Sequence, residues 1–88
     1  MSIKKWFKRP FVRRQKSITM SDGEVLYKRA IPEIISIGEV SENPHEDENI
    51  FYFNLFLVHN YSRVWRSKDR DFLESERTRL IEWVDSWK

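Results

Sequence analysis

The stretch from Ile50 to His59 constrains the fold most, because it has the length of a full strand and is apolar on both faces. Its odd positions are uniformly apolar: Phe51, Phe53, Leu55 and Leu57. Its even positions are mixed but still largely apolar: Ile50, Tyr52, Asn54, Phe56 and Val58. Successive side chains of a strand point to opposite faces, so this pattern is typical of a central strand.

The segment from Ser17 to Lys28 predicts a β-hairpin. Its centre is the dipeptide Asp22-Gly23, which best supplies the positive φ angles of a two-residue turn. In that register, the side expected to face the core holds Met20, Val25, Ile18 and Tyr27. The opposite side holds Ser17, Thr19, Leu26 and Lys28.

Two more strands and a loop follow from composition. Residues 33–40 are rich in isoleucine and predict a strand in which Gly38 marks a bulge or a close crossing. Residues 63–66 predict a short strand after a turn at residues 60–62. Residues 41–49 are polar, contain a proline, and predict a solvated loop.

The segment after Ser67 predicts a C-terminal helix with that serine as its N-cap. Its apolar residues fall within about half of the helical circumference: Phe72, Leu73, Leu80, Ile81, Trp83, Val84 and Trp87. Glu76 and Arg77 intrude within that arc, and we expect them to reach the rim or to pair. The expected fold class is therefore α+β: an antiparallel sheet of about five strands, flat or curled into a half-barrel, with one C-terminal helix packed across it.

Charge divides the chain into a basic arm, residues 1–16, and a domain, residues 17–88. The arm has seven of the 16 Lys and Arg and no carboxylate, whereas the domain has nine cations against all 14 carboxylates, a formal −5. The residues of the arm that can meet a polyanion are Lys4, Lys5, Trp6, Phe7, Lys8, Arg9, Phe11, Arg13, Arg14 and Lys16. The arm alternatively solubilises the chain, or docks on its own acidic body.

The sequence gives no sign of catalysis, of a metal site or of a bound cofactor. There is no Cys, and the two isolated glycines form no phosphate-binding loop. His59 has no nucleophile and no orienting partner at a recognisable spacing. The acidic residues around His45 are consecutive and lack the spacing of a calcium loop. We therefore expect a protein that is not an enzyme.

The even face of the Ile50–Val58 strand poses a second problem, because a single helix leaves one face of the sheet bare. Ile50, Tyr52, Phe56 and Val58 then either line a second core inside a curled sheet or form an exposed protein interface. Trp65, between Arg63 and Arg66, is an interface anchor or a stacking platform in the exposed case.

These patterns predict a small cytoplasmic interaction protein of accessory or inhibitory type. It docks on a macromolecular partner, with a protein as the first choice, through an apolar sheet face or edge assisted by the arm. The alternative is a nucleic-acid-binding protein without sequence preference, in which the arm acts with Arg63, Trp65 and Arg66. A peripheral binder of anionic membranes ranks third, and a homodimer is compatible with an exposed apolar face.

Overall fold

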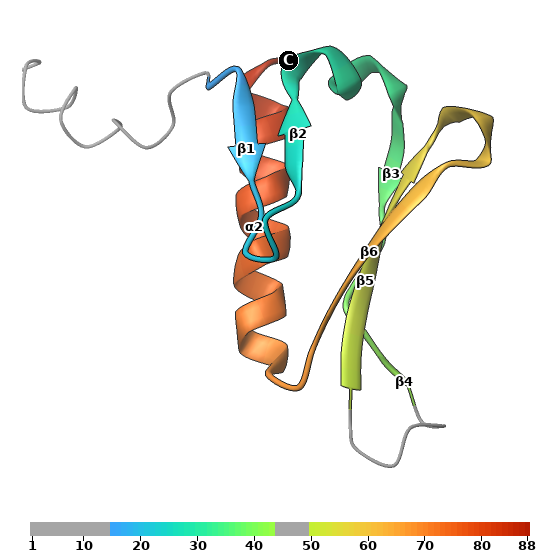
Figure 1. Cartoon of the computed structure of the whole chain (residues 1–88), viewed down its shortest axis with the longest axis vertical. Coiled ribbons are helices and arrows are strands. Elements are labelled where there is room, and N and C mark those ends of the chain that lie inside the picture. The colour runs from blue at the N-terminus through green and yellow to red at the C-terminus, as the bar shows by residue number, and fades with distance from the viewer. Residues whose placement is uncertain (1–14, 44–49) are drawn as a thin grey trace, which may run out of the picture.

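The computed structural model describes residues 15–43 and 50–88, and within them the chain forms an α+β fold (Figure 1). The fold has two antiparallel sheets and a C-terminal helix. The strands are β1 (Ser17–Thr19), β2 (Val25–Tyr27), β3 (Ile34–Ile37), β4 (Ser41–Asn43), β5 (Ile50–Leu57) and β6 (Ser62–Ser67). Short helical turns cover Lys28–Glu33 and Val58–Asn60, and α2 covers Arg70–Ser86. The α+β class is confirmed, but the single sheet of about five strands is wrong, because β1 and β2 form a separate sheet.

β5 is the central strand of the larger sheet, as its sequence predicts. β6 pairs with it over residues 51–56, and β3 and β4 pair with its two ends at residues 55–57 and 50–52. Because a strand has two edges, β3 and β4 must share one edge and follow one another along it. The sheet is thus only three strands wide at any point and does not close into a barrel.

The edge formed by β3 and β4 is irregular. The register shifts by one residue between Ile34 and Ser36, so the bulge lies at Ile35 and not at Gly38. Gly38 continues the ladder, with its N–H donating to the Asn54 carbonyl at 2.7 Å. The prediction that residues 41–49 are entirely loop is wrong for Ser41–Asn43, since β4 is a polar edge strand held by backbone pairing. Residues 44–49 lie outside the described part.

The hairpin forms where predicted, but its turn has three residues instead of two. The Met20 N–H donates to the Glu24 carbonyl, and the Gly23 N–H donates to the Met20 carbonyl. Gly23 has φ +92°, in the left-handed region. One extra turn residue reverses the faces of β2, so Ile18 pairs with Leu26 and both are buried. The predicted core positions of Val25 and Tyr27 are therefore wrong.

The N-cap of helix α2 lies two residues later than predicted. Asp69 is the N-cap, and its carboxylate accepts from the Phe72 N–H at 3.1 Å. The Ser67 hydroxyl instead accepts from the Asp69 N–H at 3.0 Å. The helix buries Leu73, Glu76, Leu80, Trp83 and Val84, whereas Phe72 is 44% exposed and does not belong to the core stripe.

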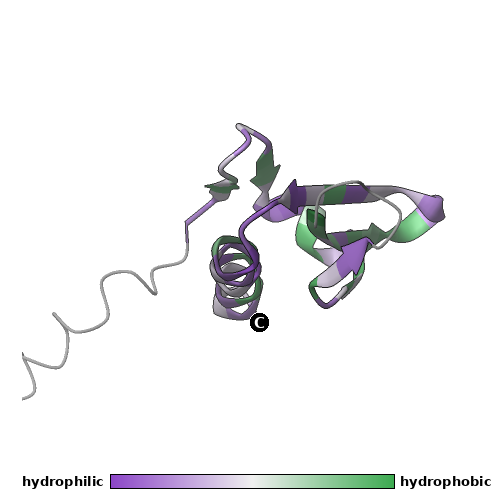
Figure 2. Ribbon diagram, turned by 90° about the horizontal axis from the view of Figure 1, so that it is seen from below, coloured by the Kyte–Doolittle hydropathy of each residue, from purple (hydrophilic) through white to green (hydrophobic). Residues whose placement is uncertain are grey.

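The core lies where α2, the hairpin and one face of the larger sheet meet (Figure 2). We call that face of the sheet the inner face. At its centre Phe53 and Leu55 are completely buried, and the Phe53 ring stacks on Trp65 with ring centroids 5.2 Å apart. The hairpin contributes Ile18, Met20 and Leu26. With about 70 residues, one shared core is the arrangement that buries most area.

The two glycines provide a test of the turn. Gly23→Ala should destabilise the protein by about 1 kcal/mol, because a Cβ meets nothing there and the cost is that of left-handed backbone alone. Gly38→Ala is the control, since its φ lies outside that region and its Cβ would be in ordinary contact, 3.4 Å from the Asn54 carbonyl oxygen. Urea unfolding measures both. An equal or smaller loss for Gly23→Ala would contradict the observed turn.

Candidate functional site

The face of the larger sheet opposite the core carries several exposed apolar side chains, and we call it the outer face. Phe56 is 41% exposed and Val64 is 44% exposed, and the neighbouring Ile35 and Tyr61 each reach 66%. Ile35, Phe56 and Tyr61 line a shallow hollow of about 440 Å³. In the described residues no helix or strand layer packs over this face (Figure 2).

Local backbone features produce this surface. Pairing places Ser36 and Ser62 on either side of Phe56, so small side chains flank the ring. The bulge at Ile35 adds an aliphatic side chain to the lining of the hollow. His59 and Asn60 both have positive φ, 63° and 65°, in the turn that leads to Tyr61. The role of His59 that the structure supports is thus conformational, because Asn and His tolerate the left-handed region better than most residues.

The side chains at the even positions of β5 lie on the face opposite the helix, as the alternation predicts. Ile50, Tyr52 and Val58 are half-buried and Phe56 is exposed, and none of the four belongs to the core cluster or packs against it. Because none of the four is fully buried, they do not form a second core within the described chain. The other interpretation, an uncovered face, agrees with the geometry.

Trp65 and its two arginines do not form one surface. Trp65 is 5% exposed and lies opposite Phe53 on the inner face, so the expected surface anchor is a core residue. Its indole Nε1 is buried without a hydrogen-bond partner among the described residues. Arg63, also on the inner side of β6, bonds the Glu24 carboxylate at 2.6 Å, whereas Arg66 lies opposite Tyr52 on the outer face.

The predicted arm lies almost wholly outside the described residues, which begin at Gln15. The Gln15 carbonyl accepts from the indole N–H of Trp83 at 2.7 Å and from that of Trp87 at 2.9 Å. The Lys16 carbonyl accepts from the Lys28 N–H at 2.8 Å. Contacts with the body thus begin two residues before the predicted boundary at residue 17, and the chain enters the fold beside the C-terminal end of α2.

Two cations that sequence reasoning missed, Lys28 and Arg29, lie at this point of entry, where the backbone of Lys28 pairs with that of Lys16. We define the basic end as Lys16, Tyr27, Lys28, Arg29 and Trp87. The Lys28 ammonium lies 4.3 Å from the centroid of the Trp87 ring, and the Arg29 guanidinium carbon lies 5.5 Å from that of Tyr27. Tyr27 is 52% exposed. The signal in the sequence is the tripeptide from Tyr27 to Arg29 at the end of the hairpin.

Polar contacts hold the hairpin, and with it the basic end, against α2. We call them the clamp, and they join Glu76 and Arg79 of α2 to the backbone of Ser21 and Thr19. Glu76 is 5% exposed and accepts from the Ser21 N–H at 2.8 Å and from the Arg79 guanidinium at 2.7 Å. Arg79 also donates to the Thr19 carbonyl at 2.7 Å. Burial acts to raise the pKa of Glu76, but the hydrogen bonds from Ser21 and the charge of Arg79 outweigh it, and the pKa of this carboxyl lies below its ordinary value.

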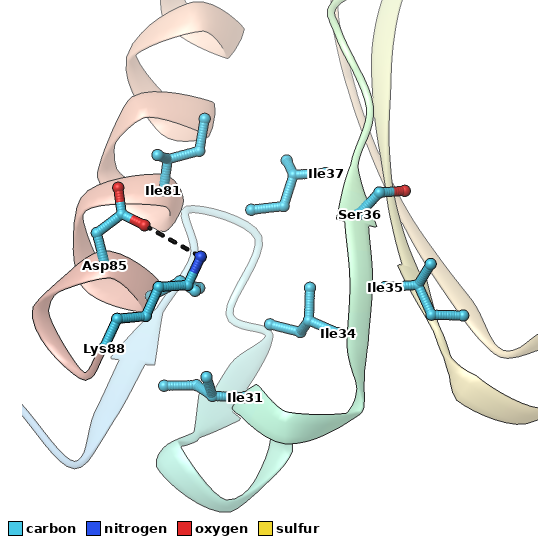
Figure 3. A pocket seen from close by; sticks show the side chains of 9 residues that line it. Ile31, Ile34, Ile35, Ser36, Ile37, Ile81, Asp85 and Lys88 are labelled. Atoms are coloured by element: carbon cyan, nitrogen blue, oxygen red, sulfur yellow. Dashed lines mark ion pairs between the residues drawn. The ribbon is translucent and has the colours of Figure 1, made fainter.

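A second hollow, of about 220 Å³, lies between β3 and the C-terminal half of α2 (Figure 3). Figure 3 shows Ile34 and Ile37 facing Ile81 across it, with the Asp85–Lys88 ion pair, 3.5 Å, at its rim. Its lining is mostly aliphatic and includes no nucleophile next to a base, so it can hold an apolar group but offers no chemistry.

Residues 15–43 and 50–88 contain no cluster of three or more His, Cys, Asp or Glu side chains that would hold a metal ion. Of the acidic residues in the predicted loop 41–49, only Glu42 is described, and it is exposed on β4. No helix in the described part is both long and apolar enough to cross a membrane. Comparison with protein-family models, curated proteins and solved structures finds no match for this chain.

The clamp predicts how stability depends on pH. A carboxyl whose pKa is lowered by folding stabilises the protein above its unfolded pKa, about 4.3, and this contribution is lost as the pH falls through the folded pKa. Glu76→Gln should therefore cost about 1–3 kcal/mol at neutral pH and progressively less in acid. Glu74→Gln is the control, because that side chain is 46% exposed and its partner Arg70 is 3.7 Å away.

Urea unfolding between about pH 3 and pH 7 makes the comparison over the range in which such carboxyls titrate. A pH-independent cost for Glu76→Gln, or an equal cost for Glu74→Gln, would contradict the clamp.

Proposed function

We propose that this protein acts by binding, as an accessory or inhibitory protein that docks on a protein partner through the outer face of its larger sheet. The observation that supports this most is the exposure of Phe56, Tyr61 and Ile35 around one hollow. Contiguous exposed apolar surface is costly in a monomer and is typical of interaction sites. No catalytic constellation competes with this function in the described residues.

The chemistry of the outer face resembles that of an interface centre. Two aromatic rings and aliphatic side chains surround the hollow, and polar groups from Ser36, Asn60 and Ser62 stand among them. No charged residue lines it, which agrees with the depletion of charge at interface cores. The rings project from a paired sheet and from a tight turn, so little order has to be gained on binding.

The face is a better docking surface than the open edge of β6. That edge has no strand beside it in the described part, and an extended segment of a partner would pair with it by backbone hydrogen bonds. Arg63 and Arg66 lie on this strand, however, and charged side chains on edge strands oppose such pairing. The hollow on the outer face has no charged residue in its lining.

The remaining proposals rank below docking. Binding of nucleic acid without sequence preference through residues 1–16 is the alternative, and it loses the support of Trp65, which is buried. Binding to an anionic membrane surface ranks third, since the described residues offer no amphipathic helix with a cationic polar face. A cytoplasmic location agrees with a chain that has no cysteine. A second copy of the chain is one partner that the outer face would accept.

Docking through the outer face predicts a large loss of affinity when one aromatic ring is removed. Phe56→Ser should lower the affinity for the partner about thirty-fold, the effect of losing roughly 2 kcal/mol at a central interface residue. Phe72→Ser is the matched control, because Phe72 is 44% exposed against 41% for Phe56 but lies on α2.

Tagged full-length protein and both variants, crosslinked in host lysate, report on a heterologous partner, and sedimentation velocity reports on a dimer. Both variants should unfold like the parent protein. Equal capture and equal self-association for all three proteins would contradict docking through this face.

A further inference from the structure

We infer that the basic end is a binding site for single-stranded nucleic acid, formed by residues of the folded body where the arm joins it. This inference rests on the alternative function above but assigns it to Lys28, Arg29 and Tyr27. It is independent of docking through the outer face, which lies on the larger sheet.

The first support is the clustering of cations from segments distant in sequence. The backbones of Lys16 and Lys28 are joined across the hairpin by the 2.8 Å hydrogen bond, and Arg29 follows Lys28 in the chain. All three are exposed. Among the described residues, none of the three forms a salt bridge with a carboxylate. Asp85, the acid nearest this end of α2, is paired with Lys88. These cations are therefore available to phosphates.

The second support is the attachment of Lys16 to the fold. The carbonyl of the preceding residue, Gln15, accepts from the indole N–H groups of Trp83 and Trp87. These bonds hold the backbone beside Lys16 against the C-terminal end of α2. The three described cations, Lys16, Lys28 and Arg29, can follow one phosphate backbone.

The third support is the arrangement of rings. Each of the two cations rests over a ring, Lys28 over Trp87 and Arg29 over Tyr27, as an exposed contact that contributes only about 0.5–1 kcal/mol. A phosphate can replace such a contact at little cost, and the ring of Tyr27, 52% exposed, then offers its face to a base. Bases expose their faces only in single strands, so the site favours single-stranded over double-stranded nucleic acid.

The body has the charge distribution that such a site needs. Its described residues hold ten Lys and Arg against eleven Asp and Glu, so repulsion of a polyanion by the whole surface is weak. Asp69, Asp71 and Glu74 lie at the start of α2, whereas the basic end adjoins its C-terminus, near the top in Figure 1. The molecule therefore presents its cationic end and keeps these carboxylates away. A lipid surface is less well matched, because the most exposed ring here is a tyrosine flanked by charges.

The test is fluorescence anisotropy of a labelled oligothymidylate with full-length protein at salt concentrations from about 50 to 200 mM. The double variant Lys28→Ala/Arg29→Ala should bind at least about tenfold more weakly at low salt, and its slope of log K against log salt should be shallower by about 1.4, twice 0.7 for two lost phosphate contacts on a single strand. The matched control is Lys68→Ala/Arg70→Ala, which removes the same charge beside the start of α2 and should bind like the parent protein.

Tyr27 gives a readout that charge alone would not move. Tyr27→Ala should weaken binding about tenfold without changing the salt slope, whereas Tyr27→Phe should bind like the parent protein, because stacking needs the ring and not the hydroxyl. Thermal unfolding checks that each variant is folded. If Tyr27→Ala is unfolded, Tyr27→Phe still tests the stacking, because weaker binding by a folded Tyr27→Phe would contradict it.

Several results would overturn the inference. Equal losses for the two double variants would mean that net charge alone matters. Stronger binding to vesicles of anionic lipid than to the oligonucleotide would assign the basic end to a membrane. Normal binding by all variants would refute the inference and leave nucleic-acid binding by the arm intact, whereas failure of the parent protein to bind at about 50 mM salt would refute both.

Discussion

One strand with two apolar faces, and too little chain to cover both, governs this structure. β5 presents Phe53 and Leu55 to one side and Tyr52 and Phe56 to the other. The helix and the hairpin both pack on the first side, where they complete a single core. No helix or strand of the described residues packs over the second side. The proposed docking function follows from this imbalance, since burial of such rings by a partner removes apolar surface from water.

The shared core explains how a hairpin of two three-residue strands persists. Such a hairpin is marginal alone, but here Ile18, Met20 and Leu26 enter the core and Glu76 receives the Ser21 N–H. A buried carboxylate would be destabilising without partners, and the Ser21 and Arg79 bonds supply them. The same contacts place Lys28 beside Trp87 at the end of α2. Fold and proposed polyanion site thus depend on one junction.

Sequence patterns were sufficient where periodicity was strong. β5, α2 and the existence of the hairpin follow from alternation, helical spacing and the Asp22-Gly23 turn signal. The register of the hairpin did not, because two-residue and three-residue turns both accept this dipeptide, and one residue reverses a whole strand. β4 was missed because backbone pairing with β5, and not its polar side chains, makes it a strand.

The other features of the candidate site depend on which residues lie together in the folded chain, and sequence patterns do not show this. Flanking arginines suggested an exposed Trp65, yet alternation along β6 puts this ring opposite Phe53. Counting charges along the chain does not identify the basic end, because the backbones of Lys16 and Lys28 pair only across the hairpin.

Carbene footprinting of the monomeric full-length protein, read residue by residue by mass spectrometry, tests the central claim most directly. An uncovered outer face predicts strong labelling of Phe56 and Tyr61, with Phe53, Leu55 and Trp65 protected. Protection of Phe56 and Tyr61 in the monomer, at the level of Phe53, would mean that the chain covers its own second face and would contradict docking through it.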